Sequence, residues 1–92
     1  MSQVRVQIIY SGRVQGVGFR YAVKSLVPGF DVQGTVRNLP DGRVELCAEG
    51  ERLELEAFQQ AIRDSGLGGL IKSETVQWTD ARRDLRGFEI VR

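Results

Sequence analysis

The chain has 92 residues, of which 41% are hydrophobic and 27% charged, and its formal net charge is +1. This size and composition predict one small soluble domain over residues 1–92, and the near-zero charge argues against bulk electrostatic binding to nucleic acid or a membrane. The chain has no histidine and a single cysteine, which excludes histidine-based triads and gives no ligand set for zinc or an iron–sulfur cluster. The sequence contains no signal segment and no long apolar run, so we expect a cytoplasmic protein.

The first two predicted elements are a strand and a helix. Hydrophobic residues alternate with polar ones over residues 4–10, which is the period of a strand with one buried face. Hydrophobic residues then recur at helical spacing over residues 19–27. We expect Pro28 and Gly29 to end this helix, because proline disfavours α geometry at the preceding Val27 and glycine tolerates the exit turn.

A β-hairpin is predicted next. Residues 32–37 and 44–49 both alternate between inward and outward positions, and residues 39–42 read Leu-Pro-Asp-Gly. Proline presets φ in such a turn and glycine accepts its left-handed position, so the two strands should pair back on each other. The alternation places Cys47 on the outer face or its margin, where we expect an inert thiol.

The second half of the chain predicts one helix and two strands. Residues 51–65 carry one apolar stripe, with glutamates in the first turn and Arg63 in the last, as the helix dipole favours. These glutamates are therefore interpreted as helix charges and not as catalytic acids. A glycine-rich loop leads to a strand over residues 71–78, and a charged connection leads to a short strand over residues 88–91.

The resulting order is β-α-β-β-α-β with a short extra C-terminal strand. This order is that of the split βαβ, ferredoxin-like sandwich, an α+β fold. We expect an antiparallel sheet that carries both helices on one face and leaves the other face more polar.

A glycine-rich run joins the first strand to the first helix. It reads Gly12-Arg13-Val14-Gln15-Gly16-Val17-Gly18-Phe19-Arg20. Backbone N–H groups at a helix N-terminus suit an anion, and an arginine fork matches two oxygens of a phosphate. Taken alone, the pattern also fits an ordinary tight turn beside a surface arginine. It is neither a Walker loop nor a dinucleotide-binding fingerprint.

The complete run resembles the signature of the acylphosphatase family. A second signature of that family is similar to Val36-Arg37-Asn38-Leu39-Pro40-Asp41-Gly42-Arg43-Val44-Glu45, and residues 88–90 resemble its closing strand. The spacing between Arg20 and Asn38 also matches. The resemblance covers essentially the full chain, and two motifs in the right order make it specific.

The resemblance implies an enzyme that hydrolyses the carboxyl-phosphate bond of acyl phosphates to a carboxylate and inorganic phosphate. The match assigns Arg20 to substrate binding and Asn38 to orientation of the attacking water. It implies a phosphate-binding loop formed by Arg13, Val14, Gln15, Gly16, Val17 and Gly18. It further implies a monomer that needs no metal or cofactor, with inorganic phosphate as product and inhibitor. Without the resemblance, Asn38 would be interpreted as a turn residue.

Two departures from the family and two alternative functions accompany this interpretation. Pro28 and Gly29 end the first helix early, and Thr35 stands where an aromatic residue is common. RNA-recognition domains share the order of elements, but their aromatic signature on the third strand is missing from residues 44–49. A non-catalytic domain that senses phosphate or acyl phosphate is the remaining alternative, and turnover distinguishes it from an enzyme.

Overall fold

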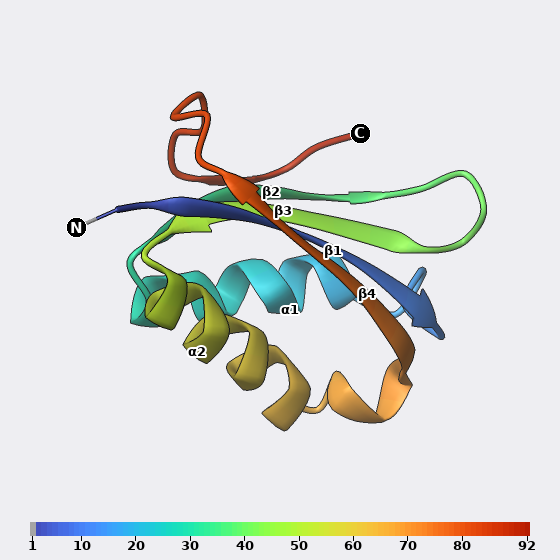
Figure 1. Ribbon diagram of the computed structural model, residues 1–92. Coiled ribbons are helices and arrows are strands. Elements are labelled where there is room, and N and C mark those ends of the chain that lie inside the picture. The colour runs from blue at the N-terminus through green and yellow to red at the C-terminus, as the bar shows by residue number, and fades with distance from the viewer. Residues whose placement is uncertain (1) are drawn as a thin grey trace.

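Strands and helices follow one another in the predicted order in the computed structural model, which describes residues 2–92 (Figure 1). The elements are β1 (Val4–Gly12), α1 (Phe19–Leu26), β2 (Val32–Asn38), β3 (Val44–Gly50), α2 (Arg52–Asp64), β4 (Ile71–Asp80) and β5 (Phe88–Ile90). Short 3-10 turns cover Val27–Gly29 and Gly68–Leu70. The ferredoxin-like α+β fold predicted from the alternation patterns is confirmed.

The five strands form one sheet in the order β4-β1-β3-β2-β5. The four longer strands pair antiparallel as predicted, whereas β5 pairs parallel with β2, so the sheet is mixed. The reason is geometric. β4 runs opposite to β1 and hence to β2, and the connection over residues 81–87 reverses the chain on its way to the far edge of the sheet. β5 therefore arrives in the direction of β2.

Both helices cover the same face of the sheet, and the core lies between them (Figure 1). The alternation predicted for β1 is observed: Val6, Ile8 and Tyr10 are at most 2% exposed, while Arg5 and Gln7 lie on the open face. The buried hydrophobic residues from the helices are Phe19, Val23, Leu55, Phe58 and Ile62. Cys47 is half-buried and lies on the open face of the sheet, as predicted.

Helix α1 ends at Leu26, but not for the reason that the sequence indicated. Val27 keeps right-handed helical angles, with φ −56° and ψ −40°, although proline follows it. The chain tightens there into a 3-10 turn that places Pro28 in its first turn, where the missing N–H of proline leaves no bond unmade. Phe30 follows this turn and packs against Phe58 of α2, with ring centroids 5.4 Å apart.

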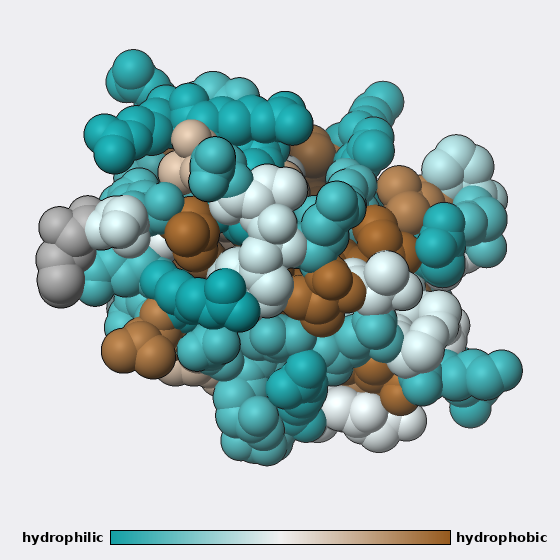
Figure 2. All heavy atoms as spheres, viewed as in Figure 1, coloured by the Kyte–Doolittle hydropathy of each residue, from teal (hydrophilic) through white to brown (hydrophobic). Residues whose placement is uncertain are grey.

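The surface is mainly polar. Figure 2 shows hydrophobic residues scattered among hydrophilic ones on the face in view. The large hydrophobic residues that are exposed include Val17, Tyr21, Leu53 and Val76. None of the helices within residues 2–92 has the length and apolar composition needed to cross a membrane.

Candidate active site

The glycine loop, residues 13–18, is fastened at its start to the second half of the chain. Gly12 has a φ of 126°, and a side chain there would collide with the carbonyl oxygen of Leu70. The Arg13 N–H donates a hydrogen bond of 2.9 Å to that same oxygen. Val14 then turns inward and is only 1% exposed, while the Arg13 side chain is exposed. The loop is therefore anchored by one hydrogen bond and one core residue.

Beyond Val14 the loop opens to the surface. Gly16 and Gly18 have φ angles of 74° and 79°, in the left-handed region that favours glycine. A side chain at either position would meet nothing within 4 Å. The glycines are thus required by backbone conformation and not by crowding, and the space above the loop is free. Val17, between them, is 48% exposed.

The loop and the start of α1 present backbone donors to that free space. Within residues 2–92, the N–H groups of residues 15–18 donate no hydrogen bond to the protein. Gly18 is the N-cap residue of α1, and the first turn of this helix contains no acidic side chain. Free N–H groups next to the positive end of a helix dipole form an environment suited to an anion.

Arg20 lies in the first turn of α1, immediately after the buried Phe19. Its side chain is half-buried and forms no ion pair or hydrogen bond with the described residues, so its guanidinium group is available to a ligand. The Phe19 ring packs on the ring of Tyr10 in β1, with centroids 5.2 Å apart. Burial, followed by the charge of Glu74, raises the pKa of Tyr10 well above its usual range, so this phenol stays neutral beneath the helix.

Asn38 is the last residue of β2, where the strand reaches the end of the sheet. Its Oδ1 atom is buried and has no hydrogen-bond partner within the described residues. A buried polar atom without a partner is uncommon in folded proteins, because desolvation of such an atom is unfavourable. The atom is therefore an acceptor available to a donor from a ligand or from water.

Gln15 joins the glycine loop to the segment that follows Asn38. Its Nε2 donates to the carbonyl oxygens of Leu39 at 2.8 Å and Arg43 at 2.9 Å. The β1–α1 connection and the β2–β3 turn accordingly lie at the same end of the sheet in Figure 1. The two signatures, 24 residues apart at this contact, are brought together by the fold. The role of the Gln15 side chain was not predicted, because no local pattern reports a contact made by tertiary folding.

Comparison with known proteins settles the family. The acylphosphatase family model matches residues 6–90. The chain belongs to the acylphosphatase family.

Individual acylphosphatases are similar over nearly their whole length. An acylphosphatase of Anaeromyxobacter dehalogenans (strain 2CP-C) is 42% identical over 88 residues, which cover 96% of this chain and 95% of the relative. One of Thermobifida fusca (strain YX) is 37% identical over 89 residues, with 97% and 98% covered. The crystal structure of the Bacillus subtilis acylphosphatase has a TM-score of 0.87 at 35% identity and covers 97% of this chain and 99% of its own. The predicted family, fold and hydrolysis of acyl phosphates are thereby confirmed.

Two further arginines of the acylphosphatase motifs are engaged in the hairpin. Arg37 Nε pairs with Glu45 Oε1 at 2.7 Å, and Arg43 Nε pairs with Asp41 Oδ2 at 2.7 Å. These guanidinium groups brace the hairpin, so they are less available to an anion than Arg20 or the exposed Arg13 of the loop. Within residues 2–92, no group of three or more histidine, cysteine or acidic residues is placed to hold a metal ion.

Proposed function

We propose that this acylphosphatase hydrolyses its substrate by attack of one water molecule on phosphorus, in line with the departing carboxylate. The water oxygen forms the new bond to phosphorus, the bond from phosphorus to the acyl oxygen breaks, and its electron pair leaves with the carboxylate. The proton of the water passes to an oxygen of the phosphoryl group. Carboxylate and inorganic phosphate are the products.

The glycine loop and Arg20 would bind the phosphoryl group. The free N–H groups of residues 15–18 would surround its oxygens, and the Arg20 guanidinium would add a two-pronged, charge-assisted contact. Phosphoryl transfer needs mainly positioning and electrostatic stabilisation, with little covalent help from the protein. Donors already held in place by the fold suit that task, because they need no reorganisation as charge develops.

The buried, unpartnered Oδ1 of Asn38 is the observation that carries the proposal for the water. An amide oxygen accepts a hydrogen bond, and the adjacent NH₂ donates one, so the group can orient a water with a lone pair toward phosphorus. An amide is too weak a base to remove the proton, which is why the proton is assigned to the substrate. Gln15 holds the segment after Asn38 against the loop that would bind phosphate.

The remaining properties follow from this assignment. Catalysis would need no metal or cofactor, because the charge of the phosphoryl group is met by N–H groups and one guanidinium. Inorganic phosphate would compete with substrate for the loop and Arg20. We also propose that the enzyme acts as a monomer, since every group in the mechanism comes from one chain. We further propose that it acts in the cytoplasm.

Hydrolysis of benzoyl phosphate in ¹⁸O-labelled water tests the mechanism. We expect the label in inorganic phosphate, activity that survives excess chelator, and competitive inhibition by phosphate. Label in benzoate would contradict attack at phosphorus, and loss of activity on chelation, restored by a divalent ion, would contradict metal-independent catalysis. Phosphate binding without any turnover would instead support the sensing alternative.

A further inference from the structure

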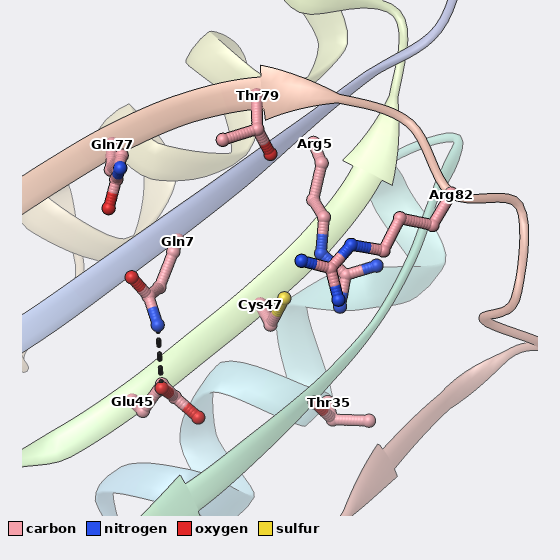
Figure 3. A pocket seen from close by; sticks show the side chains of 8 residues that line it. All are labelled: Arg5, Gln7, Thr35, Glu45, Cys47, Gln77, Thr79 and Arg82. Carbon is pink, nitrogen blue, oxygen red and sulfur yellow. Dashed lines mark hydrogen bonds between the residues drawn. The ribbon is translucent and has the colours of Figure 1, made fainter.

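A second concave region lies on the open face of the sheet, away from the glycine loop. It is a cavity of about 340 Å³. Figure 3 shows side chains from four strands and from the segment after β4 around it. The lining residues are Arg5, Gln7, Thr35, Glu45, Cys47, Gln77, Thr79 and Arg82. Neither Arg20 nor Asn38 contributes to it, so the cavity is separate from the candidate active site.

Strand register explains why these side chains meet. Gln77, Gln7, Cys47 and Thr35 are direct partners across β4, β1, β3 and β2, so they form one row on the same face. Arg5 and Thr79 are partners two residues farther along β1 and β4, so they lie on the same face as this row. Because both helices cover the opposite face, nothing in the described chain covers this row of polar groups, and the floor of the cavity is set by rigid sheet.

The acidic residue in the lining is already engaged. Glu45 accepts hydrogen bonds from Arg37 Nε at 2.7 Å and from Gln7 Nε2 at 2.8 Å (Figure 3 draws the second). Glu45 is only 16% exposed, and its charge is balanced by that of Arg37. It therefore does not neutralise the arginines on the other side of the cavity.

Arg5 and Arg82 place two guanidinium groups on the opposite wall. Arg5 Nη1 contacts Glu49 Oε2 at 2.8 Å and the exposed Asp84 Oδ1 at 3.1 Å, which fix this guanidinium in place. The Arg82 N–H donates to the same Glu49, but in the described chain the Arg82 guanidinium donates to no residue. Figure 3 shows it directed toward the guanidinium of Arg5, beside Cys47. The exposed Arg82 guanidinium is thus unpaired within the described residues and lines the cavity.

Cys47 does not supply the missing negative charge. Burial raises the pKa of its thiol, although the nearby Arg5 acts in the opposite direction, so the group is neutral near pH 7. Glu49 and Asp84 contact Arg5 and leave the neighbouring Arg82 guanidinium without a direct partner, and an anion between the two guanidinium groups would reduce their mutual repulsion. Charge-assisted, two-pronged contacts to oxygen atoms are what guanidinium groups provide best.

We propose that the cavity binds a small, doubly charged oxyanion, either a phosphate monoester or a dicarboxylate. The charged group would lie between Arg5 and Arg82, and the hydroxyls of Thr35 and Thr79 would contact polar atoms of the same ligand. The volume lies at the lower end of the range found for small-molecule sites. Binding here does not depend on the catalytic mechanism proposed for the glycine loop.

Cys47 offers a direct probe, because it is the only cysteine of the chain and lines the cavity. The rate of thiol labelling is measured with the negatively charged dithiobis(nitrobenzoate) and with neutral dithiodipyridine, and their ratio is compared among variants. A substitution that changes the thiol pKa alters both rates alike, so the ratio reports attraction of the negative charge. We expect Arg82→Gln to lower the ratio roughly three- to tenfold and Arg82→Lys to retain most of it.

Arg86→Gln is the matched control, since Arg86 is an exposed arginine of the same connection that does not line the cavity. An equal fall in Arg86→Gln, or an unchanged ratio in Arg82→Gln, would overturn the proposal. Circular dichroism of each variant confirms that the fold is retained.

Protection of the thiol identifies the ligand class. Inorganic phosphate and malonate, each at tens of millimolar, are compared with chloride at equal ionic strength in the Arg20→Ala background, which removes the main cationic side chain of the catalytic site. Slower labelling with phosphate alone assigns a phosphate monoester, and slower labelling with malonate alone assigns a dicarboxylate. Slowing by both supports the oxyanion site in general, whereas slowing by neither overturns it.

Discussion

The glycine loop and the open-face cavity both direct positive groups at a free space, but they are built differently. In the loop the donors are mainly backbone N–H groups, held by the buried Val14 and by glycines with positive φ. In the cavity the donors are side chains on a flat sheet, and Arg5 is already paired with Glu49. One region has fixed dipoles with few internal partners, and the other has two guanidinium groups, of which Arg5 is paired and Arg82 is unpaired within the described residues.

This difference indicates which region can perform chemistry. Fixed donors stabilise charge that develops during a reaction, whereas flexible or paired side chains must first reorganise. The loop also lies near the unpartnered acceptor of Asn38, through the contact that Gln15 makes. Within the described residues, no buried acceptor without a partner lines the cavity. We therefore expect substitutions at the loop to lower turnover. Substitutions at the cavity should alter only the binding of the small oxyanion proposed there.

The largest effect is expected at Arg20. Arg20→Ala removes a charge-assisted fork from a developing anion, which typically costs about 2.7–4 kcal/mol, or roughly 10²–10³ in rate. Substrate and phosphate affinity should fall as well, because the guanidinium also contacts the ground state. Arg20→Lys should not restore activity, since a point charge cannot reproduce the fork. Steady-state kinetics with benzoyl phosphate provide the measurement.

Arg86→Ala serves as the control for Arg20, because it removes an exposed arginine from another part of the surface. Full activity in Arg20→Ala would mean that the loop does not hold the substrate, and the contrast between the two regions would then fail.

Asn38→Ala should separate catalysis from binding. If the amide orients only the attacking water, its loss lowers kcat by roughly 10²-fold and leaves phosphate affinity nearly unchanged. Stability should also be kept, because Oδ1 forms no hydrogen bond within the described residues. Turnover, calorimetric phosphate binding and the melting temperature are measured on the same sample. A joint fall of all three would show that Asn38 is a structural turn residue.

Much of the fold and of the glycine loop could be predicted from the sequence, because the signals for them are local. Alternation along residues 4–10 located the buried face of β1. The turn residues 39–42 located the connection between β2 and β3. The glycine run predicted a turn through positive φ, which Gly16 and Gly18 adopt, whereas binding of phosphate by this loop is still to be tested. Catalytic roles came from the resemblance and are still to be tested.

The features that were not predicted depend on distant parts of the chain. The parallel pairing of β5 with β2 depends on how the chain returns to the far edge of the sheet. The two hydrogen bonds of Gln15 span 24 and 28 residues. At Val27 the rule for residues before proline was overridden, because the chain continues into a 3-10 turn. The open-face cavity needs four strands in register and has no signature in any one of them.

The stability of the open face should depend on pH through Glu49. Burial acts to raise the pKa of this carboxyl, but hydrogen bonds from the Arg82 N–H, the Arg5 guanidinium and the Arg83 N–H outweigh burial and hold it below its ordinary value. A lowered pKa means that the stabilisation is present above the unfolded value of about 4.3 and is lost as the pH falls through the folded value. Acid should therefore lower the contribution of Glu49 to the free energy of unfolding.

Glu49→Gln should lower the free energy of unfolding by about 1–3 kcal/mol at pH 7 and by less near pH 3. Urea titrations at both values provide the measurement, with the exposed Glu89→Gln as control. An equal loss of unfolding free energy at both pH values would show that packing, and not the charge of Glu49, keeps the segment after β4 in place. Activity per folded molecule at pH 7 should change little, because the loop is anchored elsewhere.

The smallest effect is expected at Gln15, which links the loop to the segment after Asn38. Gln15→Leu keeps the approximate volume but removes both hydrogen bonds to the Leu39 and Arg43 carbonyls. Stability should fall by about 1 kcal/mol, since the carbonyls regain contact with water. Turnover should fall roughly tenfold, because a small misplacement of reacting groups is sufficient to slow a reaction. Steady-state kinetics and urea unfolding measure the two effects.

The double variant tests whether Gln15 acts through Asn38. If its side chain aligns the loop with the water-orienting amide, Gln15→Leu should have little further effect on kcat once Asn38 has become alanine, because there is no amide left to align. Independent effects would multiply instead, which would make Gln15 a structural brace of the loop with no role in placing the water. Phosphate affinity gives a second readout: it should stay nearly constant in the double variant, since the N–H groups of residues 15–18 remain available to the anion whichever residue holds the hairpin beside them.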